Sequence, residues 1–298
     1  MTDFCYHNTA LVEPADLVRY AALVEAAAPY VTELSAFPLP ARVVVRAVIP
    51  DQYIDRQAEH NAHLTRLALA GLDADSDAAK RAPALVEEAR TAARAAARRF
   101  YPLCRAAVII HESADPELTI IPEVYDRHLH PTGRQLITVF AHQLTALALY
   151  AHYPELAWAQ RRCNALDSTL APHRRRRPAA LVPGYGQYVE RLVAKALGGP
   201  AVTGPLPDEP QPSDLYTQLR ADPDSPANAR QVDQGEQFAS VLLDAGGQPL
   251  LHLALGREAL YPTDADLNDP TTWLTRHQAA VTQTTNTTTD DSGTAGDR

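Results

Sequence analysis

The pattern of apolar and polar positions predicts a chain of many helices and a few short strands. Runs rich in β-branched residues at 41–49 and 105–111 are typical of strands, and a third run at 118–125 is weakened by Pro122. Helical spacing covers most of the remaining chain as far as residue 259. The predicted helices span residues 15–31, 51–70, 83–100, 132–153, 154–166, 184–197, 214–222, 228–245 and 249–259.

This order of elements predicts an α+β fold that is mostly α. We expect a single domain over residues 1–280, with a sheet-containing half over about 1–131 and a helical half over about 132–280. The last stretch, 281–298, is made of Thr, Asp, Gly and Ser with few apolar residues. Such a segment cannot bury enough surface to offset the entropy of ordering, so we expect a disordered tail.

Charge and cysteine content restrict the classes of function. The 298-residue chain has a net charge of −9, which argues against a nucleic-acid partner because such proteins usually carry a basic stripe. The run of arginines at 174–177 is short and is interpreted as a solvated loop. The three cysteines form no C-x-x-C pair and no signal peptide is visible, so a reducing, cytoplasmic location is expected.

An uncharged stretch at 136–153 is long enough to raise the question of a membrane span. It holds His142, Gln143 and His152, which hydrocarbon disfavours. A helix buried in the protein core explains this composition better, and no membrane association is expected.

The same helix contains a residue pattern related to a metal motif. Zinc peptidases place H-E-x-x-H on such a helix because residues four apart share a face, so both imidazoles reach one zinc ion while the Glu takes a proton from the bound water. Here the frame reads His142, Gln143 and Ala146. The Gln143 amide is not a useful base and the Ala146 methyl group binds no metal. A lone histidine on an apolar helix is more often a satisfied core residue.

Later segments strengthen the match. The run L-V-P-G-Y-G-Q-Y at 181–188 has the cadence of E-G-x-A-E-Y, and L-Y-P-T at 260–263 precedes D-P-T-T-W-L-T-R at 269–276. Together these segments resemble an actinobacterial zincin-like family of zinc-dependent metalloproteases associated with deazaflavin-coenzyme biosynthesis. The resemblance covers roughly residues 136–276 and implies a zincin-like metalloprotease fold.

Carried over to this chain, the resemblance places His142 at the first zinc ligand and Gln143 at the general base. Ala146 and Pro183 stand at the second and third ligands, and Gln187 at a further acidic position. The resemblance therefore implies a degenerate member of the family with a remnant of its site. Four further residues match positions that shape such a site: Thr145, Gly184, Tyr185 and Tyr188.

Two hypotheses follow. The first is a pseudoenzyme that holds no cofactor and uses the family's cleft to bind a peptide, a protein or a small molecule. The second is an enzyme with a rewired site around His142, which would hold zinc and act as a metal-dependent hydrolase or a biosynthetic enzyme. Candidates for the cleft or for such a site are His111, Glu112, Glu123, His128, His130, Tyr185, Gln187 and Glu190.

Overall fold

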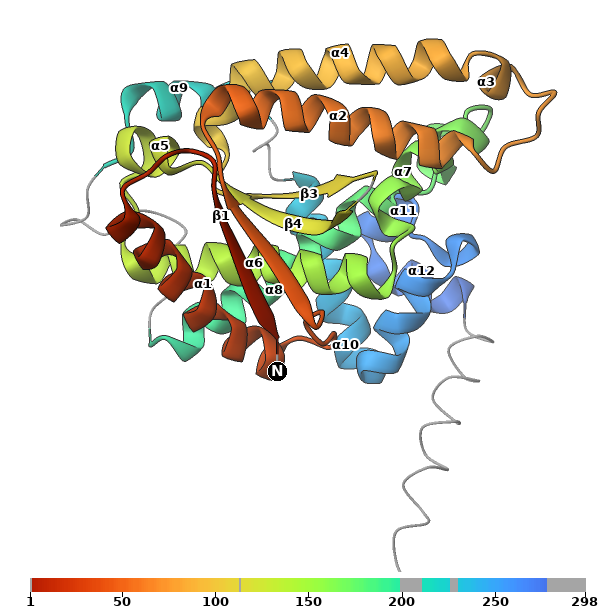
Figure 1. Cartoon of the computed structure of the whole chain (residues 1–298). Coiled ribbons are helices and arrows are strands. Elements are labelled where there is room, and N and C mark those ends of the chain that lie inside the picture. Colours follow the sequence, from red (N-terminus) through yellow and green to blue (C-terminus); the bar gives the residue numbers. More distant parts are fainter. Residues whose placement is uncertain (1, 113, 199–210, 226–229, 278–298) are drawn as a thin grey trace, which may run out of the picture. The chain divides into compact units, whose positions relative to one another are not determined.

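The structure is a computed structural model of the chain and describes residues 2–112, 114–198, 211–225 and 230–277. It is an α+β fold that is mostly α, as the sequence pattern predicts (Figure 1). The strands are β1 (Asp3–Asn8), β2 (Arg42–Ala47), β3 (Ala107–His111) and β4 (Ala114–Ile120). The helices are α1 (Pro14–Leu34), α2 (Pro50–Leu69), α3 (Asp77–Lys80), α4 (Ala82–Phe100), α5 (Pro122–Val124), α6 (Gly133–His152), α7 (Leu156–Leu166), α8 (Leu181–Ala196), α9 (Asp214–Ala221), α10 (Arg230–Gly256), α11 (Asp264–Asn268) and α12 (Pro270–Arg276).

Contacts divide the chain into two compact units. The first comprises Met1–Trp158 with Val189–Ala229, and the second Ala159–Tyr188 with Arg230–Arg298. This division does not follow the two halves expected on either side of residue 132, because a segment of α8 and the residues after it belong with the sheet. The expected single domain stays a prediction. The expected disordered tail at 281–298 lies outside the described residues.

The first unit is built around a four-stranded mixed sheet in the order β1-β2-β4-β3. β1, β2 and β4 run parallel, and β3 pairs antiparallel with β4 at the edge. Helices α2 and α4 lie over one face of the sheet, and α1 and α6 over the other (Figure 1). Both faces are covered, so the central strands bury side chains on both sides of the sheet, as consecutive Leu118, Thr119 and Ile120 of β4 do.

Two features of the sheet differ from the sequence prediction. β1 was not predicted, since Phe4 and Tyr6 alternate with polar residues over only six positions. β4 lies earlier than the predicted strand at 118–125, because Pro122 has no N–H for the ladder and instead begins α5. Glu117 inside β4 masked the strand in the sequence pattern, and its carboxylate is paired with the Arg46 side chain of β2, with Nε and Oε2 2.9 Å apart.

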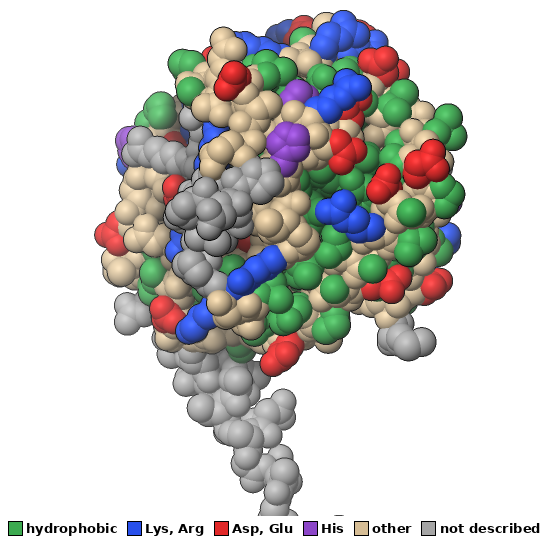
Figure 2. All heavy atoms as spheres, turned by 90° about the vertical axis from the view of Figure 1, so that its left-hand side faces the viewer, with side chains coloured by type: hydrophobic (Ala, Val, Ile, Leu, Met, Phe, Trp, Pro, Cys, Tyr) green, Lys and Arg blue, Asp and Glu red, His purple; other side chains and the backbone are tan. Residues whose placement is uncertain are grey.

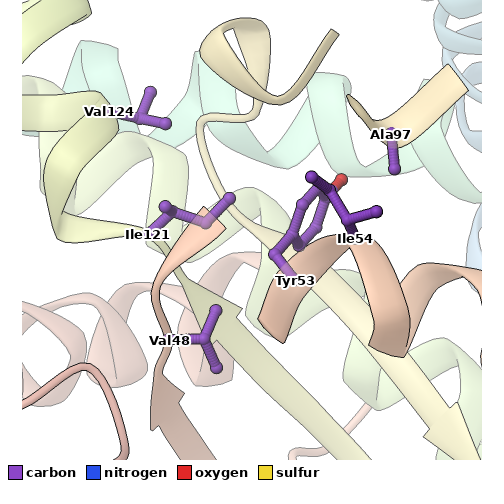
Figure 3. Close-up of a cluster of buried hydrophobic side chains, with 6 residues drawn as sticks. All are labelled: Val48, Tyr53, Ile54, Ala97, Ile121 and Val124. Atoms are coloured by element: carbon purple, nitrogen blue, oxygen red, sulfur yellow. The ribbon is translucent and has the colours of Figure 1, made fainter. Parts of the chain in front are cut away.

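One part of the hydrophobic core lies where α2 and α4 meet the strand ends. Val48, Tyr53, Ile54, Ala97, Ile121 and Val124 form this cluster, and their side chains converge in Figure 3. At about 25 cal/mol per Å² of apolar surface, each buried Val or Ile side chain contributes roughly 1.5–3 kcal/mol before the entropy of ordering is subtracted.

The second unit contains the kinked helix α10. The sequence predicted two helices, at 228–245 and 249–259, and the break lies at Gly247, with φ of 66°, followed by Pro249. Trp273 of α12 is fully buried against Phe238 of α10, with ring centroids 5.8 Å apart, and its indole nitrogen donates to the Leu260 carbonyl. The family-like segments near the C-terminus thus form a packed corner of this unit.

Candidate functional site

The site residue His142 lies on α6, whose local sequence fixes where the helix begins and ends. Thr132 caps its N-terminus by accepting from the Gln135 amide, while the Gln135 side chain accepts from the Thr132 amide. The helix ends at His152, just before Pro154. Its core-facing residues, including Phe140 and Leu144, are fully buried, so the predicted buried helix at 132–153 is confirmed.

His142 belongs to an array of three side chains from distant parts of the sequence, and two of them, His142 and Glu190, are buried. Its Nδ1 lies 3.0 Å from Oε2 of Glu190 on α8. Arg105, just before β3, reaches the same carboxylate with both terminal nitrogens, at 3.1 Å and 3.4 Å. His142 and Glu190 are each 9% exposed. The carboxylate is therefore held between an imidazole and a two-pronged guanidinium.

The charges of this array can be assigned from its geometry. Burial favours the neutral acid at Glu190, but the Arg105 charge and the hydrogen bond from His142 outweigh it and lower the pKa of Glu190 to about 2. An ionised carboxylate only accepts hydrogen bonds, so His142 donates from Nδ1. The other ring nitrogen, Nε2, is then the one left for chemistry or for a ligand.

The array matches the way in which metal-binding histidines are oriented. Such residues almost always donate their second ring N–H to a carboxylate or carbonyl, which fixes the tautomer and the ring plane. Glu190 provides this contact to His142 here. Glu190 was among the cleft candidates of the sequence, whereas Arg105 was missed, because no sequence pattern links it to residues 85 positions away.

The remaining motif positions do not provide metal ligands. Gln143 and Ala146 follow His142 on α6, and the Ala146 side chain is buried. Pro183 and Gln187 lie in the part of α8 that belongs to the second unit. Within the described residues, no group of three or more His, Cys, Asp or Glu side chains could hold a metal ion. The residues present therefore do not fit the zinc ion that the family resemblance implies.

Two of the residues expected to shape the site, Gly184 and Tyr185, have packing roles. Gly184 of α8 lies against Gly235 of α10, so close that an added Cβ would come within 2.5 Å of the Glu236 amide nitrogen. Tyr185 is buried and its ring stacks on Tyr188, with centroids 6.0 Å apart. These contacts account for both residues without any reaction.

His111 belongs to a second polar cluster around the buried Glu117. Its Nε2 lies 3.3 Å from Glu117 Oε1, and Arg56 of α2 contacts both side chains. Burial, with the charges of Arg56 and Arg46, lowers the pKa of His111 to about 4, so the ring is neutral at pH 7. Glu112 is exposed and pairs with Arg66 at 3.1 Å.

The other candidate residues near α6 lie in the turn before it. His128 is buried and its Nδ1 lies 3.1 Å from the Ser213 hydroxyl, which fits a structural role. Glu123 pairs with Arg127 on the surface, at 3.2 Å. His130 adopts a left-handed backbone with φ of 47°. Among the described residues, no hydrogen bond or ion pair joins these side chains, or His111, to His142.

One described helix segment, Gln231–Gly256 of α10, is long and apolar enough to cross a membrane by length and composition. Core helices of water-soluble proteins satisfy the same criterion, and Phe238, Leu242 and Leu250 of this helix are fully buried. The finding is weak support for a span, and the expected cytoplasmic location stays a prediction.

No protein-family model and no curated protein matches this chain. Among solved structures, the chain is similar to a crystal structure from Chloroflexus aurantiacus described as "a putative hydrolase with a novel fold". The two share 17% sequence identity with a TM-score of 0.52, over 90% of this chain and 93% of the other. At this identity the likeness shows a shared fold and nothing about activity.

Proposed function

We propose that this chain is a zincin-like pseudoenzyme, which keeps the scaffold of a metallopeptidase and uses it to bind a peptide, a protein or a small molecule. The observation that carries the proposal is the orientation of His142 by Glu190, as in a metal site, beside Gln143 and Ala146 in place of a base and a ligand. His142 and the carboxylate that orients it are present, while the second and third ligand positions hold Ala146 and Pro183.

Charge supports the same conclusion. A working zincin site with two His ligands and one Glu ligand combines imidazoles with two carboxylates, the ligand and the general base, which attract a divalent cation. Here the Arg105 guanidinium compensates the charge of Glu190, the carboxylate that contacts His142. Such a site offers a zinc ion one imidazole nitrogen and little electrostatic attraction.

The test restores the missing ligands. The variant combines Gln143→Glu, Ala146→His and Pro183→Glu, and zinc per chain is measured by elemental analysis after dialysis against a weak chelator. We expect no zinc in the wild type and about one zinc per chain in the variant, as a three-ligand site should hold. Adding His142→Ala to the triple variant is the matched control and should remove that zinc.

Other outcomes would contradict the proposal. A wild-type protein that retains one metal per chain would show a rewired metal site and overturn the pseudoenzyme. If neither protein binds zinc, the placement of the third ligand at Pro183, or the family resemblance itself, is wrong.

A second candidate function is a hydrolase that needs no metal, and the His142–Glu190 dyad favours it. A carboxylate that accepts from Nδ1 leaves Nε2 as a base able to take a proton from an attacking water or hydroxyl group. A panel of ester and amide substrates would reveal this activity. It should survive a chelator, be lost in His142→Ala, and fall by roughly 10²-fold or more in Glu190→Gln. If the wild type hydrolyses none of these substrates, this second candidate function is wrong, and the contact between His142 and Glu190 is structural.

A further inference from the structure

A cavity of about 270 Å³ in the first unit lies apart from the residues of the His142 array. Its walls come from α1, from the turn that follows α5 and from the first turn of α6. Figure 2 faces the side of the molecule where α1 and α5 lie, and acidic, basic and histidine side chains are exposed on that face. The lining residues are Arg19, Tyr20, Tyr125, Asp126, His130, Pro131 and Leu136.

The cavity contains complementary charges that the protein leaves unpaired. Arg19 and Asp126 are exposed at its rim. Neither forms an ion pair within 4.0 Å, with the other or with any residue in the described part of the chain. The carboxylate of Asp16 is also close enough to act on Asp126: partial burial and this second negative charge raise the pKa of Asp126, against the opposing charge of Arg19. A bound cation would relieve the repulsion between the two carboxylates.

The floor of the cavity has an apolar part and a polar part. Leu136 and the rings of Tyr20 and Tyr125 are buried, and the two rings pack 5.6 Å apart. The Tyr125 hydroxyl donates to the Arg105 carbonyl. For the Tyr20 hydroxyl, the described residues provide no hydrogen-bond partner, although Tyr20 is only 3% exposed. Tyr20 lines the cavity, so its hydroxyl can bond to a polar molecule held there.

The backbone around the cavity is irregular in a way that is common at functional sites. Residues Tyr125–Leu129 form a single π-helical turn, and His130 ends it in the left-handed region with φ of 47° and ψ of 49°. Both conformations cost free energy relative to a regular helix end, and both are enriched at ligand sites. They place Asp126 and His130 on the wall opposite α1.

We propose that this cavity binds a small zwitterion, a molecule of amino-acid size that carries one carboxylate and one ammonium group. The Arg19 guanidinium would hold the carboxylate, Asp126 would accept from the ammonium group, and the Tyr20 hydroxyl would bond to either. The proposal is independent of the pseudoenzyme proposal, since none of these residues belongs to the His142 array.

The test is isothermal titration calorimetry of the full chain with glycine, L-alanine, L-leucine, L-glutamate and L-lysine, each up to about 10 mM, a range that detects binding down to roughly millimolar Kd. Propionate and propylamine, which each carry a single charge, are titrated in parallel. We expect at least one amino acid to bind, and both single-charge analogues to bind at least about 10-fold more weakly than it does.

Variants then assign the contacts. Arg19→Met, Asp126→Asn and Tyr20→Phe should each weaken binding, the two charge variants by about 10-fold or more and Tyr20→Phe by less. Arg127→Met is the matched control, because Arg127 lies in the same turn but pairs with Glu123 on the surface. This variant should bind the amino acid with the affinity of the wild type. Circular dichroism checks that each variant is folded.

Three results would overturn the proposal: no amino acid binds in this range, a single-charge analogue binds as tightly as the best amino acid, or Arg19→Met and Asp126→Asn keep wild-type affinity.

Discussion

At the scale of single residues, the contacts of Glu190 with Arg105 and His142 stabilise the folded chain. A buried carboxylate is costly unless its partners compensate, and removing one partner of a buried pair is more damaging than never having had the pair. Arg105 is the compensating charge for Glu190, and its side chain is 41% exposed, so part of its contribution is screened by solvent.

The first prediction concerns Arg105→Met, which leaves Glu190 without its cation. We expect a loss of about 2–3 kcal/mol in the free energy of unfolding at pH 7, measured by urea titration, because the ionised carboxylate stays buried beside His142 alone. The control Arg127→Met removes an exposed pair and should change stability by less than about 0.5 kcal/mol. Equal effects of the two substitutions would contradict the role of Arg105.

The same array predicts a pH dependence of stability. The pKa of Glu190 is lowered from 4.5 to about 2 on folding, so its contribution is present above pH 4.5 and is lost as the pH falls toward 2. Urea titrations of the wild type between pH 5 and pH 2 should show this loss, which is at most about 3 kcal/mol from this group. Glu190→Gln has no such titration, so its stability should fall less over this range. If the free energy of unfolding changes equally with pH in the two proteins, the pKa of Glu190 is not lowered on folding.

At the scale of elements, the sequence was informative where a pattern is local. The buried helix α6 follows from its capping residues and its uncharged apolar run, and β2 and β3 follow from their β-branched residues. β4 was misplaced, because the Glu117 charge is compensated by Arg46 of β2 and Arg56 of α2, contacts that no local pattern shows. The pairing of Arg105 with Glu190 was missed for the same reason.

Close helix packing gives a prediction at this scale. Gly184→Ala would push a Cβ into the Gly235 backbone of α10, where no flexible side chain can move aside. We expect a loss of about 1–3 kcal/mol in the free energy of unfolding, as for other overpacked cores. The control is Gly133→Ala in the first turn of α6, where the nearest atom to an added Cβ is Leu23 Cδ2 at 3.5 Å, an ordinary contact. If Gly184→Ala is as stable as this control, the two helices are not in close contact at Gly184.

At the scale of the whole molecule, the order of predicted elements indicated the fold class, but it did not reveal how the contacts divide the chain. Helix α8 begins in the second unit and continues past Val189 into the first, so Glu190 and Gly184 lie on one helix but in different units. Sequence periodicity describes α8 as one element, and only contacts between distant residues show that it is shared.

The sharing of α8 predicts how the chain unfolds. Melting either unit alone would leave one end of α8 without its packing partners, at the cost of the apolar surface that Val189, Val193 and Tyr185 bury. We therefore expect one calorimetric transition, with a calorimetric enthalpy equal to the van't Hoff enthalpy. Gly184→Ala in one unit and Arg105→Met in the other should then each lower the midpoint of this same transition. Two separated transitions, each sensitive to only one of the substitutions, would show two independent domains and would make the predicted single domain wrong.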